Sequence, residues 1–339
     1  MPPLGGGMEF NMIKYFRELT KILSVSGHEE KLAAYIAEKM EPYFDTVRTD
    51  SMGNLICHKK GEGKKLMFCA HMDEIGFMVT YIEDDGYIRF APIGGINFTA
   101  TAYNEVVFEN GRLGVIVPEE EVKAADFKAD KFVVDIGAKS KKEAERLVKI
   151  GDCFAVRSHV TSLAGGRISG GPLDDKIACA ILMAAAEKSA EFTNDVTFVF
   201  TVQEEVGIRG SRTAAFAVAP DYGIAVDVTD TGDTKGSKPM AVKLGGGAAI
   251  KIKDQSAICD ATLVEKMKET AKENKIPYQL EILTFGGTDT ASMQLSGEGC
   301  RAGCISIPTR YIHSPVETAD EKDIKAAIEL TVALCKAEY

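Results

Sequence analysis

The chain has 339 residues, which corresponds to about two domains and leaves room for a large hydrophobic core. Hydrophobic residues make up 45% and charged residues 27% of it, values that are ordinary for a globular protein and exclude a disordered chain. No apolar run reaches the roughly 18 residues of a membrane span. The net charge of -10, without a long cluster of lysine and arginine, argues against nucleic acid as a partner.

Residues 1–7 lack the charged and apolar regions of a signal peptide, so we treat them as a flexible extension outside the fold. The eight cysteines are scattered, and several lie in apolar runs such as residues 66–70. This distribution is typical of reduced thiols in a protein core. We therefore expect a cytoplasmic protein.

The N-terminal segment is predicted to be helical, because apolar residues recur at helical spacing over residues 10–23 and again after residue 30. Ser26 and Glu29 have the spacing of a capping box, which predicts the start of the second helix. Strand-like runs follow at residues 54–57 and 66–70. The second run is continuously apolar, as in a strand buried inside an α/β sheet.

Between residues 78 and 160 the pattern changes to short alternating runs separated by turn signals. We interpret three of these signals as hairpins, at residues 84–86, 94–95 and 110–111. One helix is expected in this segment, capped by Ser140 with Glu143 and ending near Lys149. The segment therefore predicts a small β-domain.

Helices and strands of an α/β domain return after residue 160. Helices are predicted at residues 175–188, 261–274 and 321–337, and strands at residues 196–202, 223–228, 279–283 and 303–307. We therefore expect one discontinuous α/β domain, residues 8–77 and 161–339, with residues 78–160 inserted into it.

Residues that can bind metal lie at the ends of the predicted strands or, in one case, directly before a helix. They are His71, Asp73, Asp174, Glu204, Glu205, Asp227 and His313. Because ligands of open α/β sheets bind outside the carboxyl ends of the strands, we expect these side chains to share one site. Asp174 precedes the helix at residues 175–188, where the backbone N–H groups and the helix dipole favour a carboxylate.

Two imidazoles and several carboxylates suit a divalent ion such as zinc, manganese or cobalt, and they suffice for two ions that share a carboxylate. Adjacent Glu204 and Glu205 can both reach one cleft at a frayed strand end, so one can bind metal while the other acts as a general base. Plainer interpretations remain open: structural histidines, a double helix cap at the Asp-Asp pair, and a solvated acidic turn before Gly207.

Six segments, in this order along the chain, resemble the motifs of the M42 family of dimetal aminopeptidases, which includes tetrahedral TET aminopeptidases and glutamyl aminopeptidases. They are residues 71–76, 173–175, 201–210, 226–229, 286–289 and 307–317. The resemblance runs from about residue 9 to the end of the chain. It implies the dimetal exopeptidase fold, a mixed sheet flanked by helices, with a barrel-like insert.

The resemblance also implies a role for each residue of the site. The implied metal ligands are Asp174 as a bridge between two ions, His71 and Asp227 in one site, and Glu205 and His313 in the other. Glu204 would be the catalytic base that accepts the proton of the water between the two metal ions, which leaves a hydroxide bridging them. The carboxylate of Asp73 would hold the imidazole of His71 through its second nitrogen. The peptide bond between Asp174 and Asp175 would be cis.

The implied activity is the removal of N-terminal residues from short peptides by a metalloaminopeptidase that contains two divalent ions per subunit, zinc or cobalt before manganese. The β-domain, residues 78–160, would be a dimerisation domain that builds a homo-oligomer, a dimer or a tetrahedral dodecamer. Specificity stays open, although a pocket near residues 286–292 is expected for the first side chain. The alternatives are an endoglucanase-type glycoside hydrolase and a non-catalytic scaffold.

Overall fold

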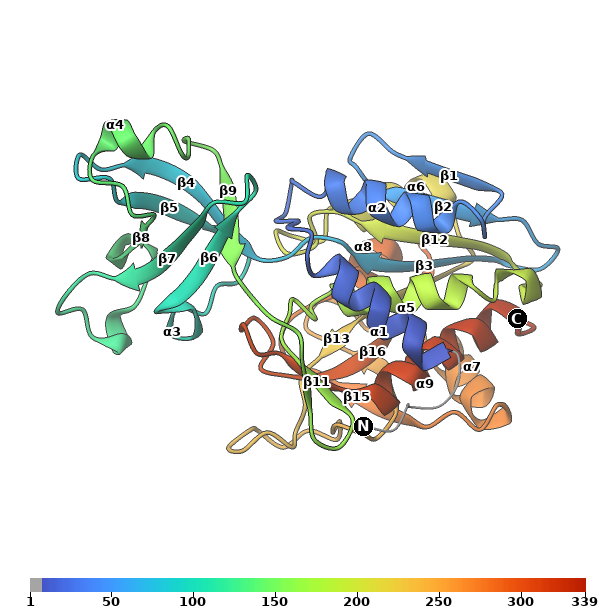
Figure 1. The fold of residues 1–339 in the computed structure, drawn as a ribbon. Coiled ribbons are helices and arrows are strands. Elements are labelled where there is room, and N and C mark those ends of the chain that lie inside the picture. The colour runs from blue at the N-terminus through green and yellow to red at the C-terminus, as the bar shows by residue number, and fades with distance from the viewer. Residues whose placement is uncertain (1–7) are drawn as a thin grey trace.

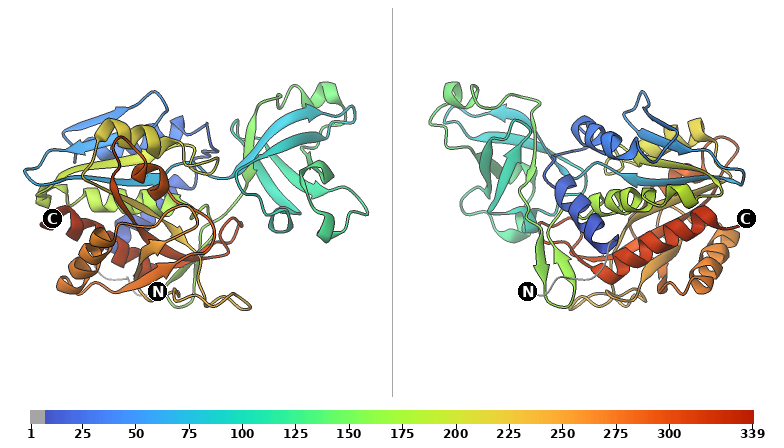
Figure 2. Two further views of the ribbon diagram at one scale, coloured as in Figure 1. Left: turned by 180° about the vertical axis from the view of Figure 1, so that it is seen from behind. Right: turned by 45° about the vertical axis from the view of Figure 1, so that its right-hand side comes forward.

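A computed structural model describes residues 8–339, so the extension predicted at residues 1–7 lies outside the described residues. The protein has two lobes, a large α/β domain and a closed β-barrel beside it (Figure 1). The two further views in Figure 2 show the same separation. The predicted fold class, a mixed α/β sheet flanked by helices with a barrel-like insert, is confirmed.

The large lobe is built on a mixed sheet of 11 strands. Its strands are β1 (Thr46–Thr49), β2 (Leu55–Lys59), β3 (Lys65–His71), β10 (Thr161–Leu163), β11 (Arg167–Ser169), β12 (Asp195–Thr201), β13 (Tyr222–Thr229), β14 (Ala248–Lys253), β15 (Tyr278–Ile282), β16 (Arg301–Arg310) and β17 (Thr318–Asp320). The order is β1-β2-β12-β3-β13-β16-β17-β11-β10, and β14 pairs with β15 and β16. The four central strands β12, β3, β13 and β16 run parallel, so their carboxyl ends meet at one edge.

Helices cover both faces of this sheet. They are α1 (Met8–Leu19), α2 (Glu30–Met40), α5 (Lys176–Ala186), α6 (Gly210–Val218), α7 (Ala261–Glu273), α8 (Thr290–Gln294) and α9 (Glu321–Lys336), with a short 3-10 turn at Ser189–Glu191. Residues of α1, α2, α5, α7 and α9 share the main hydrophobic core, and α6 and α8 cover a smaller core on the other face.

The position of β3 in the middle of the sheet explains why its sequence is continuously apolar. Leu66, Phe68 and Ala70 belong to the main core, while Met67 and Cys69 belong to the smaller core on the opposite face. Successive residues of a strand point to opposite sides of the sheet, and helices cover both sides here. The apolar run at residues 66–70 is therefore the signature of a central strand, as predicted.

The smaller lobe is a closed barrel with the strand order β4-β5-β8-β7-β6-β9. Its elements are β4 (Gly76–Ile82), β5 (Ile88–Ile93), α3 (Phe98–Thr101), β6 (Asn104–Phe108), β7 (Leu113–Pro118), 3-10 turns at Ala124–Asp126 and Ala129–Lys131, β8 (Phe132–Asp135), α4 (Lys141–Ala144) and β9 (Cys153–Val156). A phenylalanine cluster fills it, in which Phe77 and Phe154 stack with ring centroids 5.0 Å apart. Closure leaves the barrel without a free sheet edge.

Several local predictions need correction. The hairpins at residues 84–86 and 110–111 are confirmed, but residues 94–95 lead from β5 into α3 and form no hairpin. Ser140 caps α4, yet this helix ends at Ala144 and not near Lys149.

The N-terminal helices also differ from prediction. Helix α1 ends at Leu19, because the following backbone is bonded elsewhere: Ile22 accepts a hydrogen bond from Lys176, and Ser24 N donates one to Glu74. The capping box at Ser26 is wrong, because α2 begins at Glu30 without a side-chain cap.

Removing one ring from the main core should destabilise the large lobe. Phe198 is fully buried, with ring centroids of Phe44 and Phe68 at 5.4 and 5.6 Å. We expect Phe198→Ala to lower the free energy of unfolding by about 3–5 kcal/mol, measured by denaturant titration. Phe216→Ala on α6, where the side chain is 73% exposed, is the control and should change it by less than about 0.5 kcal/mol. Equal losses in both variants would contradict the placement of Phe198.

Candidate metal centre

The predicted site residues gather at the carboxyl edge of the central strands. His71 ends β3, and Asp227 lies near the end of β13. Glu204 and Glu205 lie three and four residues after the end of β12. His313 lies in the connection from β16 to β17, and Asp174 precedes α5. The structure thus brings together segments that are far apart in the sequence.

Two groups of three side chains, among the residues that the structure describes, could each hold a metal ion. In the first, His71 Nε2 lies 3.0 Å from Asp174 Oδ1 and 3.9 Å from Asp227 Oδ1. In the second, His313 Nε2 lies 3.3 Å from Asp174 Oδ2 and 3.4 Å from Glu205 Oε1. Asp174 therefore presents one oxygen to each group, which is the geometry of a bridging carboxylate.

The charge balance of the centre favours bound cations. Burial and the neighbouring carboxylates raise the pKa of Glu204 and Asp227 well above the usual range. Burial lowers the pKa of His313, but hydrogen bonds to Asp174 and Glu205 outweigh it and raise this pKa to about 12. The carboxylates thus favour the positively charged form even of an imidazole. A pair of divalent ions would supply the positive charge that these carboxylates need. Nitrogen and oxygen donors in this number fit such ions.

Glu204 belongs to neither metal group. It lines a cavity of about 460 Å³ together with His71, Asp174 and Glu205. Phe285, Gly286, Gly287 and Thr288 line the same cavity, close to the place predicted for the pocket of the first side chain. Thr290 is fully buried; it donates a hydrogen bond to Gly303 O and accepts one from the cavity-lining Thr288 at 3.0 Å.

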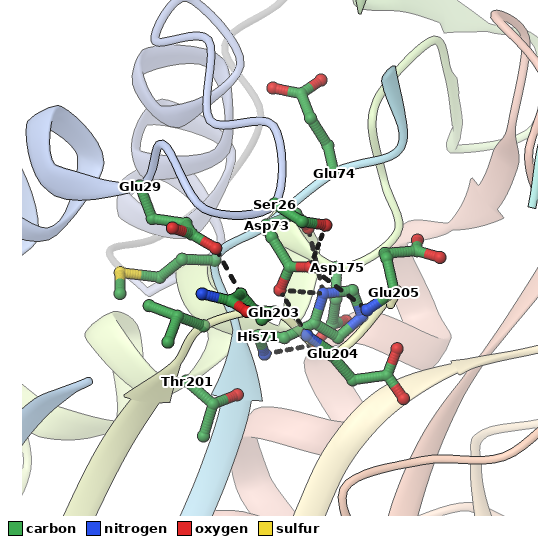
Figure 3. A network of polar contacts seen from close by, with 12 residues as sticks. Ser26, Glu29, His71, Asp73, Glu74, Asp175, Thr201, Gln203, Glu204 and Glu205 are labelled. Carbon is green, nitrogen blue, oxygen red and sulfur yellow. Dashed lines mark hydrogen bonds and ion pairs between the residues drawn. The ribbon is translucent and has the colours of Figure 1, made fainter. Parts of the chain in front are cut away.

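The carboxylate of Asp73 holds the backbone of the Glu204–Glu205 segment (Figure 3). Its Oδ1 accepts a hydrogen bond from Glu204 N at 2.9 Å, and its Oδ2 accepts from Glu205 N at 3.1 Å and from Ser26 Oγ at 2.6 Å. His71 Nδ1 lies 3.0 Å from the backbone oxygen of Asp73 and 3.6 Å from its Oδ1. Asp73 thus orients the imidazole mainly through its carbonyl group.

Glu317 ends the last of the six motifs, but the sequence does not indicate its role. Its Oε2 accepts hydrogen bonds from Leu173 N at 2.6 Å and Asp174 N at 3.0 Å, and its Oε1 accepts from His313 N at 2.8 Å. One buried carboxylate therefore fixes the backbone of two predicted ligands. The only available signal was an acidic residue four positions after His313, and this spacing alone does not name its partners.

The barrel also touches the centre. A side chain atom added at Gly95 would lie 3.1 Å from the imidazole of His313, and one added at Gly94 would lie 3.4 Å from Glu205 Cβ. Gly94 has φ +78°, a conformation that glycine adopts without strain. This glycine pair is therefore a close approach to the ligands.

The backbone next to Asp174 is also unusual. The Asp174–Asp175 peptide bond is cis, as the resemblance implies. Asp175 Oδ2 accepts a hydrogen bond from His71 N at 3.2 Å, which connects the two ligand segments.

Comparison with known proteins identifies the family. The family model for M42 glutamyl aminopeptidase matches residues 53–330. The chain belongs to the M42 peptidase family. This confirms the resemblance that the six motifs indicate, and it makes the protein a hydrolase of peptide bonds that acts as an exopeptidase.

Individual relatives cover nearly the whole chain. Lysyl aminopeptidase of Pyrococcus furiosus is 36% identical over 91% of this chain and 92% of its own. The TET1 peptidase of Pyrococcus horikoshii, described as assembling into a tetrahedron or a large octahedral shell, superposes with a TM-score of 0.87 at 34% identity over 96% and 99% of the two chains. A Thermotoga maritima structure titled endoglucanase superposes with a TM-score of 0.81 at 33% identity over 95% and 96%.

Replacing Glu317 by glutamine should weaken metal binding. The amide can accept from one side only, and its NH2 group would face a backbone N–H donor. We expect Glu317→Gln to lower metal affinity by roughly 10- to 100-fold, measured by competition with a chelator of known affinity. The exposed Glu298→Gln is the control. Unchanged affinity in Glu317→Gln would show that the ligand segments hold their geometry without this carboxylate.

Proposed function

We propose that the protein removes N-terminal residues from short peptides with the help of two divalent metal ions. The observation that carries the proposal is the position of Asp174 between two imidazole-carboxylate groups. In this proposal His71 and Asp227 complete one metal site with Asp174, and Glu205 and His313 complete the other.

Bound ions would polarise the carbonyl group of the first peptide bond and lower the pKa of the attacking water. Glu204 lines the cavity and belongs to neither ligand group, so its carboxylate is placed to accept the proton of that water and to return it to the leaving amine. Asp73 acts through Glu204 by holding its backbone N–H. The free α-amino group would be held by one of the ions or by a nearby carboxylate, and this contact would restrict cleavage to the first peptide bond.

The donor set restricts the metal without naming it. Both groups consist of imidazole and carboxylate donors, which suit zinc, cobalt and manganese. All eight cysteines are free, and all except Cys300 are buried, which supports a reducing, cytoplasmic location. None of the helices in residues 8–339 is long and apolar enough to cross a membrane.

The barrel is the proposed dimerisation domain, residues 78–160, of a homo-oligomer. Several large apolar side chains are exposed on it, including Tyr103 at 74% and Ile150 at 68%. Where such side chains form a contiguous patch, they are typical of an association surface. The assemblies described for the TET1 peptidase of Pyrococcus horikoshii support a dodecameric tetrahedron as the form to test.

A glycoside hydrolase is the main alternative, because two similar structures carry titles that name an endoglucanase, one of them alongside a peptidase. The chain contains no tryptophan for stacking on sugar rings. A pair of carboxylates suffices for glycoside hydrolysis, so that chemistry leaves the two imidazole-carboxylate groups without a role. A non-catalytic scaffold would leave the cavity and Glu204 without a role as well.

The activity can be tested with matched peptides that carry either a free or an acetylated N-terminus. We expect the metal-loaded protein to cleave only the free peptides, because acetylation removes the α-ammonium charge, and we expect a chelator to abolish cleavage. Mass spectrometry of the products would also rank the preferred first residue. Failure to cleave any peptide with metal bound would overturn the proposal, and cleavage of an oligosaccharide panel would replace it with the glycosidase.

The general base can be tested with Glu204→Gln. The amide cannot accept the proton, so we expect kcat to fall by about 10²- to 10⁴-fold while the metal content stays at the wild-type value. Elemental analysis and steady-state kinetics on the same preparation measure both quantities. Near-wild-type kcat would remove Glu204 from this role.

A further inference from the structure

The loop before α2 contacts the segment that carries Glu204. Ser26 Oγ donates a hydrogen bond to Asp73 Oδ2 at 2.6 Å. Glu29 Oε1 accepts hydrogen bonds from Gly27 N at 2.8 Å and from Gln203 N at 3.0 Å. Figure 3 shows Glu29 reaching from this loop to Gln203, and Ser26 lying beside the carboxylate of Asp73.

Two carboxylates therefore hold three successive backbone N–H groups. Glu29 binds the N–H of Gln203, and Asp73 binds those of Glu204 and Glu205. Gln203 has φ +55°, a left-handed conformation that is unfavourable for a residue with a side chain. An acceptor at its N–H stabilises this turn, and the turn directs the residue that follows it.

The side chain of Glu29 does not act as a helix cap. It occupies the N-cap position of α2, but no side-chain cap hydrogen bond is formed. Only 4% of the residue is exposed, so an unsatisfied carboxylate there would be costly. Its donors include Gln203, which is 174 positions away in the sequence. The carboxylate therefore connects the N-terminal loop to the end of β12.

We propose that Glu29 is a positioning residue for the general base, that it acts by fixing the left-handed turn at Gln203, and that Ser26 assists it by holding Asp73. The proposal rests on the proposed function, because it takes Glu204 as the base. Neither residue lines the cavity of about 460 Å³, so both act through the Gln203–Glu205 backbone and not on the peptide.

The test compares Glu29→Ala and Glu29→Gln with the control Glu30→Ala. Glu30 is the next residue in the chain, and its side chain is exposed. Alanine removes the acceptor of Gln203 N, whereas glutamine keeps one oxygen that can accept from both N–H groups. We expect Glu29→Ala to lower kcat by roughly 10- to 100-fold, as for a catalytic group displaced by about 1 Å, with KM and metal content unchanged. Glu29→Gln should recover most of this loss, and Glu30→Ala should match the wild type.

A rescue variant separates positioning from a general loss of structure. Glycine adopts φ +55° without strain, so adding Gln203→Gly to Glu29→Ala should restore part of kcat. If Glu29→Ala does not fold, Glu29→Asp replaces it, because the shortened side chain should not reach Gln203 N. Wild-type kcat in a folded variant that lacks the contact would overturn the proposal. So would a loss of kcat that neither Glu29→Gln nor Gln203→Gly relieves.

Glu204→Gln, measured in the same experiment, distinguishes a failure of the proposed general base from a failure of the positioning role. If Glu204→Gln keeps its kcat, the proposed base is wrong and the positioning role fails with it. If Glu204→Gln loses kcat while Glu29→Ala keeps it, only the positioning role is overturned. Loss in both, with recovery in Glu29→Gln and no change in Glu30→Ala, is the result that we expect.

Discussion

The constraint on which this structure depends is the burial of several carboxylates at one edge of the sheet. Each of them loses hydration there and repels the others, so each needs either a cation or a hydrogen-bond donor. Asp174, Asp227 and Glu205 face the two imidazoles. Asp73 and Glu317 are instead surrounded by backbone N–H groups. The fold thus compensates buried negative charge in two ways, with imidazoles and with backbone N–H groups.

This division assigns different work to chemically similar residues. The carboxylates that face the cavity form the proposed metal ligands and the proposed base. The carboxylates behind them hold the backbone: Asp73 holds the segment after β12, and Glu317 holds the segments of Asp174 and His313. A carboxylate is a strong acceptor in a dry environment, because hydrogen bonds to an ionised group are shorter and stronger than neutral ones. The backbone of the proposed ligands is therefore fixed by residues that do not line the cavity.

The sequence predicts much of the fold because period and burial are local properties. The continuous apolar run of β3 and the helical spacing of α5, α7 and α9 survive in the structure nearly as expected. The polar residues at strand ends could also be found, since parallel strands bring their carboxyl ends together. The hydrogen-bond network behind these residues could not be predicted from the sequence. Ser26 and Glu29 have the spacing of a capping box whatever their real partners are, and Asp73 and Gln203 are reached only after the chain has folded.

The connections of the barrel have a mechanical consequence. The chain enters the barrel directly after His71 and Asp73, and it leaves through β10 and β11 toward Asp174. A third contact is made by Gly95 against the imidazole of His313. A rotation of the barrel relative to the large lobe would therefore displace three parts of the centre together: His71 with Asp73, Asp174, and His313. In the proposed homo-oligomer, a force applied to the barrel would reach His71, Asp73 and Asp174 through the two backbone connections that join the barrel to the large lobe.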